Sequence, residues 1–250
     1  MHVSPWLIRQ RLSSQVSRRL YCFPCAGGNP ASYRAWQAKV DPAIEICAVQ
    51  LPGRGTRFDE KPLTELGELV KSISAEIARD GCIPFAFFGH SLGALIGFEV
   101  ARYCRLAYLP TPAHLFVAAC DPPQCRKPSK GLHALPDNTL LYELGEYNGT
   151  PPEILAHKEL MALMLPTIRA DFALVENYCY RPAPPLKLPI TVLASHGDMH
   201  VDHNRVGAWR QETTRECRVR WFDGDHFFVH TQSDAVVDLV SAEFAETLCA

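Results

Sequence analysis

A serine between two glycines is the residue of this chain best suited to nucleophilic chemistry. Residues 89–93 read Gly-His-Ser-Leu-Gly, with the apolar segment 85–88 before them and a helix-forming stretch after them. A GxSxG motif between a strand and a helix is typical of a nucleophile elbow, a strained turn that exposes the serine hydroxyl. Side chains two residues before or after the serine would collide, which explains both glycines. We therefore predict that Ser91 is a nucleophile; the alternative is an ordinary serine in a tight turn.

Attack by such a serine on a carbonyl creates an oxyanion, which backbone N–H groups stabilise. The N–H of Leu92 opens the helix after the serine, and we predict that it is one donor. A second donor is expected in the loop after an earlier strand. The segment Phe23–Gly28 (FPCAGG) fits that place, and we predict the N–H of Ala26 as the donor. A plain glycine turn is the alternative interpretation.

A nucleophilic serine also needs a general base, and in a strand, elbow and helix context the chain order is serine, acid, histidine. His226 lies in Asp223–Phe228 (DGDHFF), a turn directly after the last strand-like segment. That position brings the imidazole to the carboxyl edge of the sheet, beside Ser91. We predict that His226 is the base; the alternative is a polar loop histidine.

The acid is expected after the preceding strand-like segment, where residues 195–204 read SHGDMHVDHN. Asp198 and Asp202 are both candidates. Asp198 is closer to the end of the strand, whereas Asp202 leads into a helix predicted over 206–215 and is able to cap it. We predict Asp198 as the acid and keep Asp202 as the alternative.

The same ten residues contain three histidines, which raises the question of a metal site. His196 and His200 are spaced i, i+4, but Gly197 and the position at a strand end oppose the helix that would place both rings on one face. No HExxH motif occurs. We therefore predict no metal and no cofactor, and expect His196, His200 and His203 to be exposed or to orient an aspartate.

The elements around these residues alternate in type. The strand-like segments are 19–23, 44–50, 85–89, 113–119, 190–194 and 219–222, and helical patterns cover 63–79 and 91–108. Such alternation predicts a single α/β domain over 1–250, with a mainly parallel sheet covered on both faces. No strand is evident between 122 and 189, so we predict an insertion there, with a helical lid over about 122–166.

Composition narrows the classes of protein and partner. The 250 residues are 47% apolar with a net charge of −2, which disfavours nucleic acid and membrane surfaces as partners. The first twenty residues contain scattered arginines rather than a signal sequence, and no stretch reaches the roughly 20 apolar residues of a membrane span. The ten cysteines are irregularly spaced, and we expect them, including the CxxC of Cys22 and Cys25, to be small buried hydrophobic residues. We expect a soluble, cytoplasmic protein.

Taken together, these motifs resemble the type II, or editing, thioesterases of nonribosomal peptide and polyketide synthases, which have the α/β-hydrolase fold. The matching segments are RLYCFPCAGGNPASYRAW (19–36), VQLPGRGTRFDE (49–60), FGHSLGALIGFEVAR (88–102), PTIRADFALVENYCYRPAPP (166–185), WRQET (209–213) and DGDHFFV (223–229). In that family the acid precedes a Trp-Arg pair by about eleven residues, and Trp209 then indicates Asp198. Two departures are the SHGDM turn, where relatives usually have Gly-Asp-x-Asp-Pro, and Cys25, where an aromatic residue or histidine is more usual.

The resemblance implies hydrolysis of acyl or aminoacyl thioesters on the phosphopantetheine arms of carrier proteins, for editing or product release. It implies an acyl-enzyme formed by Ser91, Asp198 and His226, and carrier domains as partners of a monomer. Alternatives are a carboxylesterase, a fatty acyl carrier thioesterase, an acyltransferase and a non-catalytic carrier-binding protein. Apolar lid residues either line an acyl channel or pack the lid: Leu140, Leu141, Leu144, Leu155, Leu160, Met161, Leu163, Met164 and Leu165. Arg126, Lys127 and Lys130 either contact the carrier or are ordinary solvated side chains.

Overall fold

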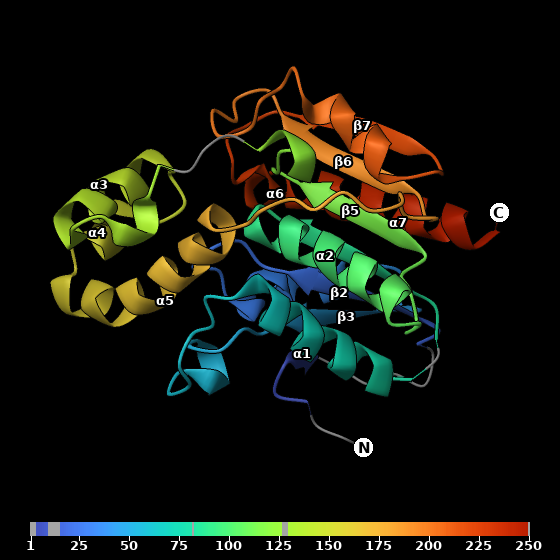
Figure 1. Cartoon of the computed structure of the whole chain (residues 1–250), viewed down its shortest axis with the longest axis horizontal. Coiled ribbons are helices and arrows are strands. Elements are labelled where there is room, and N and C mark those ends of the chain that lie inside the picture. Colours follow the sequence, from blue (N-terminus) through green and yellow to red (C-terminus); the bar gives the residue numbers. More distant parts are fainter. Residues whose placement is uncertain (1–3, 10–15, 82, 127–129, 250) are drawn as a thin grey trace.

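A mainly parallel sheet forms the centre of the molecule (Figure 1). The computed structural model describes residues 4–9, 16–81, 83–126 and 130–249. In these residues one sheet has the strand order β1-β3-β2-β4-β5-β6-β7, and only the pairing of β1 with β3 is antiparallel. The strands are β1 (Leu7–Arg9), β2 (Arg18–Phe23), β3 (Ile44–Val49), β4 (Phe85–His90), β5 (His114–Ala118), β6 (Ile190–Ser195) and β7 (Cys217–Phe222). The predicted fold class and the six predicted strands are confirmed; β1, which has three residues, was not predicted.

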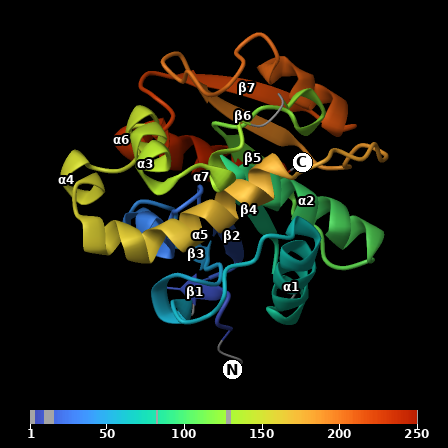
Figure 2. The same ribbon diagram turned by 60° about the vertical axis from the view of Figure 1, so that its left-hand side comes forward.

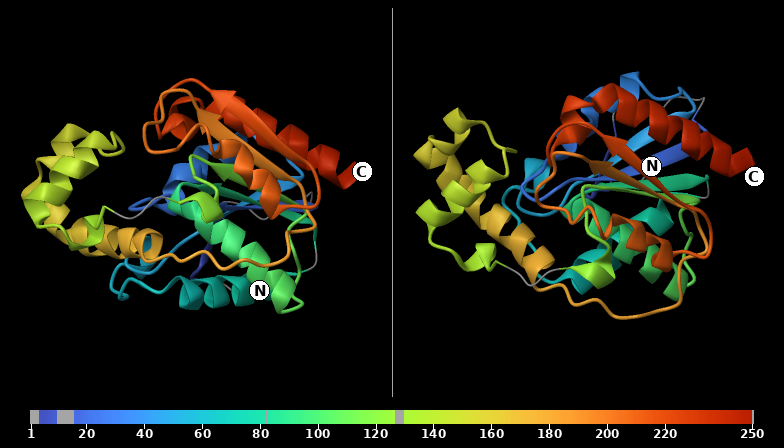
Figure 3. Two further views of the ribbon diagram at one scale, coloured as in Figure 1. Left: turned by 45° about the horizontal axis from the view of Figure 1, so that its top comes forward. Right: turned by 90° about the horizontal axis from the view of Figure 1, so that it is seen from above.

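Helices cover both faces of this sheet (Figure 3). One face carries α1 (Leu66–Arg79), α2 (Leu92–Leu106) and the 3-10 segment η5 (Val206–Glu212), and the other carries η1 (Pro30–Ala38), α6 (Phe228–Thr231) and α7 (Ser233–Cys249). The remaining 3-10 turns are η2 (Gly55–Arg57), η3 (Pro123–Cys125) and η4 (Leu132–Ala134). The helix predicted over 206–215 is thus a shorter 3-10 segment. None of the described helices combines the length and the apolar character needed to cross a membrane.

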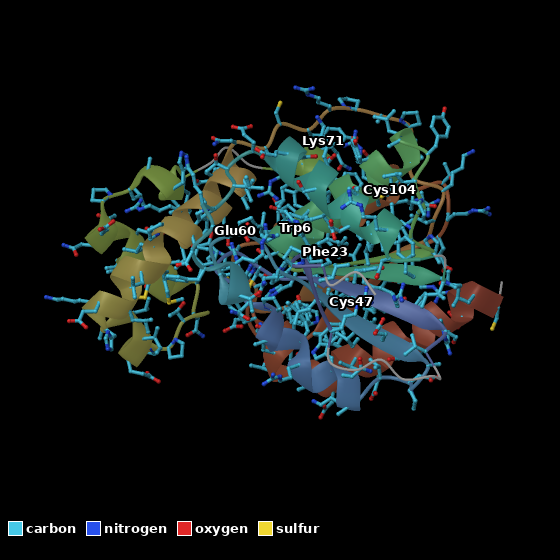
Figure 4. All side chains as sticks on the ribbon, turned by 90° about the horizontal axis from the view of Figure 1, so that it is seen from below. Trp6, Phe23, Cys47, Glu60, Lys71 and Cys104 are labelled. Atoms are coloured by element: carbon cyan, nitrogen blue, oxygen red, sulfur yellow. The ribbon has the colours of Figure 1, made fainter. Side chains whose placement is uncertain are left out.

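Successive side chains of each strand point to opposite faces of the sheet, so the hydrophobic core consists of two layers. Phe23 packs edge-on against Phe87 on the face of α1 and α2, with ring centroids 5.1 Å apart. On the other face Trp36 packs against Phe88 at 4.8 Å. In Figure 4 the labelled Phe23 lies inside the main body. Since both faces of the sheet are buried, functional side chains are expected in the loops at the ends of the strands.

The segment between β5 and β6 builds a separate group of helices beside the main body (Figures 1 and 2). It contains α3 (Asp137–Glu146), α4 (Pro152–Leu155) and α5 (Lys158–Glu176). The boundary expected near 166 falls inside α5, because Pro166 lies within that helix without ending it. We call 122–166 the lid segment below.

Apolar side chains of the lid segment mostly pack against one another. Leu140, Leu144, Met161 and Leu165 are buried in a cluster that is distinct from the two layers beside the sheet. Leu163 is an exception, with an exposed fraction of 59%. Of the two interpretations of these residues, packing of the lid therefore holds for the four buried ones.

Candidate active site

Ser91 lies at a sharp turn between β4 and α2. Its φ is 55° and its ψ is −115°, in a region that residues other than glycine rarely adopt. Its N–H still donates to the carbonyl oxygen of Ala118 at 2.8 Å, so the turn begins while β4 is paired with β5. Strain of this kind persists only where the surrounding structure imposes it, and it is concentrated at functional sites. The strand, turn and helix predicted around the GxSxG motif are present.

The two glycines of the motif are required by two different neighbours. A Cβ on Gly89 would lie 2.3 Å from the carbonyl oxygen of Gly93 and 2.4 Å from Ala94. A Cβ on Gly93 would lie 2.0 Å from the carbonyl oxygen of Phe23. The second glycine therefore admits the backbone that follows β2. This contact places the loop of Ala26 directly against the elbow.

A chain of two hydrogen bonds joins Ser91, His226 and Asp198. The Nδ1–H of His226 donates to Asp198 Oδ2 at 2.8 Å, so Nε2 is the acceptor nitrogen and receives the Ser91 hydroxyl at 3.0 Å. Asp198 is 2% exposed and His226 is 5% exposed. The structure thus brings together the three residues predicted as nucleophile, base and acid, in the order that general-base activation of a serine requires.

Asp198 is held as a carboxylate. Burial acts to raise its pKa, but the hydrogen bond and charge of His226, together with the N–H of His200, lower the pKa below its usual value. That N–H donates to Asp198 Oδ1 at 2.8 Å, so both carboxylate oxygens have a donor. A buried, ionised aspartate fixes the tautomer of the histidine ring that it faces.

The loops of Asp198 and His226 are tied together beneath these side chains. The N–H of Gly197 donates to the carbonyl oxygen of Gly224 at 3.0 Å, and a Cβ on Gly197 would lie 2.5 Å from the same oxygen. The hydroxyl of Ser195 also donates to Gly224. Farther along, the buried Trp209 donates through Nε1 to the carbonyl oxygen of Cys120 at 3.0 Å. The loop after β6 is thus fixed at both ends.

Asp202, the alternative acid, has a different environment. Its carboxylate accepts the N–H of Asn204 at 3.2 Å and lies 3.4 Å from Nε of Arg205. Its own N–H donates to Asp121 at 2.8 Å. The N-terminal capping position of η5 is Arg205, so Asp202 forms a turn ahead of that segment and does not cap it.

Each histidine near Asp198 packs against an aromatic ring. His196 stacks on Trp221 at 4.9 Å with 12° between the ring planes, and His203 meets the edge of the same ring at 5.3 Å. His200 stacks on Tyr147 of the lid segment at 3.8 Å and 5°. Among the described residues no group of three or more His, Cys, Asp or Glu side chains is arranged to hold a metal ion.

His90, for which the sequence indicated no role, supports His226, the predicted base. It is 1% exposed, and its Nε2–H donates to the carbonyl oxygen of His226 at 2.8 Å. Burial, and then the neighbouring His226, lower the pKa of His90 to about 3, so the ring is neutral. The residue was visible within the GHSLG motif, but its partner lies 136 residues away.

The two predicted oxyanion donors are available. Within the part of the chain that the structure describes, the N–H groups of Ala26 and Leu92 donate to no protein acceptor. Ala26 lies in a turn closed by a 2.9 Å hydrogen bond from the Gly28 N–H to the Cys25 oxygen. Leu92 is the first residue of α2, where an N–H has no partner within the helix.

The structure also shows the environments of the cysteines and basic residues that were singled out from the sequence. Burial raises the pKa of Cys22 well above its usual value and that of Cys25 to about 12, which opposes a reactive thiolate pair. Arg126 lies 3.9 Å from the sulfur of Cys120, and Lys130 pairs with Glu143 at 3.7 Å. Lys127 lies outside the described residues.

Known proteins resemble this chain over almost its whole length. A family model described as "Thioesterase domain" matches residues 18–244. The gramicidin S biosynthesis protein GrsT of Aneurinibacillus migulanus is 38% identical over 238 residues, which cover 95% of this chain and 93% of that protein. Thioesterase PikA5 of Streptomyces venezuelae is 32% identical over 239 residues, which cover 94% and 84%.

A solved structure has the same architecture. The type II thioesterase BorB from the borrelidin biosynthetic cluster superposes with a TM-score of 0.89, at 32% identity, and the match covers 98% of this chain and 99% of that one. The central sheet and its helices are therefore those of an α/β-hydrolase thioesterase, as the resemblance implied. The family match, the relatives and this structure show that the chain belongs to the thioesterase domain family, as a type II thioesterase that hydrolyses thioester bonds.

Proposed function

We propose that Ser91, His226 and Asp198 form the catalytic triad of an enzyme that hydrolyses acyl or aminoacyl thioesters on the phosphopantetheine arms of carrier domains. The observation that carries this proposal is the continuous pair of hydrogen bonds from Asp198 through His226 to Ser91. The names of GrsT and BorB refer to gramicidin S and borrelidin biosynthesis, which supports carrier domains of peptide and polyketide synthases as partners.

In the first half-reaction the serine takes over the acyl group. His226 Nε2 accepts the hydroxyl proton while Ser91 Oγ attacks the thioester carbonyl. The N–H groups of Leu92 and Ala26 stabilise the oxyanion of the tetrahedral intermediate. The intermediate collapses with cleavage of the C–S bond, and His226 returns the proton to the departing sulfur. Throughout, Asp198 holds the ring orientation and stabilises the imidazolium.

In the second half-reaction water releases the acid. His226 accepts a proton from a water molecule, whose oxygen attacks the acyl ester of Ser91. A second oxyanion forms at the same two N–H groups. Collapse breaks the ester bond, and the proton on His226 passes to Ser91. The products are the free carboxylic acid, the carrier thiol and the unmodified enzyme, and no cofactor takes part.

The lid segment 122–166 acts in this proposal as a cover over the acyl group and adjoins the surface that receives the carrier. Arg126, Lys127 and Lys130 are candidates for contact with the carrier domain. The enzyme removes misprimed or stalled acyl groups, or releases an intermediate. An amino acid, a short acyl chain and a medium-length fatty acyl chain are the substrates to compare.

We place the enzyme in the cytoplasm as a monomer. The nine cysteines that the described residues contain are all free thiols, which is typical of a reducing compartment. All residues of the triad come from one chain, so no second copy is needed to complete it. Sedimentation analysis is expected to show one species near the chain mass of 27.9 kDa, and a stable dimer would contradict this part of the proposal.

The test compares wild type with Ser91→Ala on carrier proteins loaded with acetyl, aminoacyl or octanoyl groups. Wild type is expected to remove the acyl group, and Ser91→Ala to match the rate of carrier alone. If neither protein exceeds that rate on any carrier, the proposed function fails. Preferred cleavage of octanoyl carrier favours the fatty acyl alternative, and cleavage of oxygen esters without any carrier activity favours the carboxylesterase.

A further inference from the structure

Arg54 and Asp171 form a buried ion pair far from the triad in sequence. Arg54 lies in the loop after β3, and Asp171 lies in the second half of α5. Two guanidinium nitrogens of Arg54 donate to the two oxygens of Asp171, at 2.8 and 2.7 Å. Their side chains are 7% and 2% exposed. Because desolvation offsets most of the attraction in a buried pair, stability alone is a weak reason for it.

The remaining hydrogen bonds of this pair go to the loop of Ala26. Asp171 Oδ2 accepts the N–H of Gly27 at 2.7 Å, and Nη1 of Arg54 donates to the carbonyl oxygen of Gly28 at 3.0 Å. The pair therefore binds two backbone groups directly after the residue whose N–H is proposed to meet the oxyanion. Figure 4 shows the labelled Glu60 of the loop after β3 on the side of the main body that faces α5.

The turn from Cys25 to Gly28 explains why such anchoring matters. Gly27, its third residue, has a φ of +68°, which is the signature of a type II turn. A turn of this type converts to type I when its central peptide unit, here Ala26–Gly27, rotates by about half a turn. That rotation would point the Ala26 carbonyl oxygen at the carboxylate of Asp171. Charge repulsion and the loss of the 2.7 Å hydrogen bond both oppose it.

The charge of the pair also suits a site where negative charge develops. A lone carboxylate behind the loop would disfavour an oxyanion at the Ala26 N–H, because like charges repel in a medium of low dielectric constant. The bidentate guanidinium of Arg54 cancels that charge at contact distance. Asp171 therefore acts on the loop as a hydrogen-bond acceptor with little net field at the oxyanion.

We infer that Asp171 and Arg54 are positioning residues of the oxyanion hole. By holding the Gly27 N–H and the Gly28 carbonyl oxygen, they fix the turn whose first peptide unit, Cys25–Ala26, directs its N–H at the tetrahedral intermediate. This inference rests on the proposed function. It assigns to Arg54 and Asp171 a role in the transition state rather than in substrate binding, since both side chains are buried. If the hydrogen bond from Gly27 to residue 171 is removed, kcat and the affinity for a tetrahedral adduct are expected to fall while KM stays unchanged.

Two variants of similar size separate this role from a structural one. Asp171→Asn and Asp171→Leu both remove the charge, but only asparagine keeps an oxygen that accepts the Gly27 N–H. The measurements are kcat and KM on an acyl carrier, and the inhibition constant of an alkyl trifluoromethyl ketone, which forms a tetrahedral adduct with a serine nucleophile. Asp238→Asn, which changes an exposed acid of α7, serves as the matched surface control.

Asp171→Leu is expected to lower kcat about 10- to 100-fold and to weaken the ketone by a similar factor, with KM unchanged within about twofold. Asp171→Asn is expected to keep ketone affinity within about fivefold of wild type. Equal ketone affinity in the two variants would overturn the inference, and so would a rise in KM at unchanged kcat. The proposed function is judged separately, by whether Ser91→Ala abolishes the turnover of wild type.

If the unpaired guanidinium prevents folding, the same comparison is made in an Arg54→Met background. Replacing a buried ion pair by uncharged side chains of similar volume is often tolerated. In that background asparagine still offers an acceptor to the Gly27 N–H and leucine offers none. The asparagine double variant is expected to bind the ketone at least about fivefold more tightly than the leucine one, and equal binding contradicts the inference.

Discussion

The ring of Tyr147 in the lid segment lies parallel to the ring of His200, 3.8 Å away, and Tyr147 also meets the edge of His226 at 5.9 Å. The next two residues continue the contact. Asn148 donates to Asp225 at 2.8 Å, and Gly149 lies so close to the Phe227 ring that a Cβ there would be 2.0 Å from it. Three successive residues of the lid segment thus pack on the loops that carry Asp198 and His226.

Removing the Tyr147 ring is expected to loosen the lid segment. Tyr147→Ala loses the stacking with His200, which contributes about 1 kcal/mol in addition to the free energy of burying the ring. Because exchange through local opening depends on this free energy, amide hydrogen exchange over 137–155 is expected to accelerate about 10-fold or more. Tyr142→Ala, which removes a ring of α3 that is 66% exposed, is the control. Equal exchange in both variants would show that the lid is held elsewhere.

The identity of the acid is tested by two conservative substitutions. Asp198→Asn is expected to lower kcat by about 10³- to 10⁴-fold, because the amide no longer holds the His226 tautomer that accepts the serine proton. Asp202→Asn changes a side chain whose contacts include Asn204 and Arg205, and is expected to stay within a few-fold of wild type. Steady-state hydrolysis of acyl carrier measures both. A large loss confined to the Asp202 variant would reverse the assignment.

Two glycines of α2 are expected to respond in opposite directions to alanine. In Gly93→Ala the new methyl would meet the Phe23 carbonyl at 2.0 Å, so a loss of several kcal/mol in unfolding free energy is expected. In Gly97→Ala the nearest atom is 3.4 Å away, and the higher helix propensity of alanine is expected to add about 0.5–1 kcal/mol. Urea unfolding followed by circular dichroism provides the comparison. A stabilised Gly93→Ala variant would contradict the close packing of the elbow.

The loss of folding stability at acid pH is expected to depend on His114. Burial lowers its pKa to about 3, while an unfolded histidine titrates near 6.5. Between these values the unfolded chain binds the extra proton, so the contribution of His114 is complete above pH 6.5 and is lost as the pH falls towards 3. The slope amounts to about 1.4 kcal/mol per pH unit.

His114→Gln is therefore expected to flatten the dependence of unfolding free energy on pH between about 3.5 and 6. His196→Gln, which replaces an exposed imidazole, is the control. Unfolding in urea at a series of pH values gives both slopes. An unaltered slope in the His114 variant would mean that this ring titrates normally.

The positions of Ser91, Asp198 and His226 could be predicted from local sequence and from the order of the strands. The strand before Ser91 and the helix after it are both encoded within about twenty residues, so the elbow followed from the motif. Asp198 and His226 followed from chain order, because the carboxyl ends of neighbouring parallel strands meet at one edge of the sheet. The structure brings these three side chains into hydrogen-bonding distance.

Contacts across long separations could not be predicted in this way. Arg54 and Asp171 are 117 residues apart, and neither has a neighbour in sequence that indicates its partner. The stacking of His200 on Tyr147 depends on how the lid segment folds back, which no periodicity encodes. The three histidines near Asp198 suggested metal chemistry only because the sequence does not show the aromatic rings on which they pack.

The course of α5 through Pro166 sets a limit on exchanging lids between enzymes of this fold. Beyond the proline, Thr167 donates to the carbonyl oxygen of Gly53 at 2.8 Å, and Asp171 receives the Gly27 N–H. A chimera that imports a foreign lid together with the whole helix would replace these contacts as well. Grafts that join at or before Pro166 transplant only the segment proposed as a cover, and leave the recipient's own contacts with Gly53 and Gly27 in place.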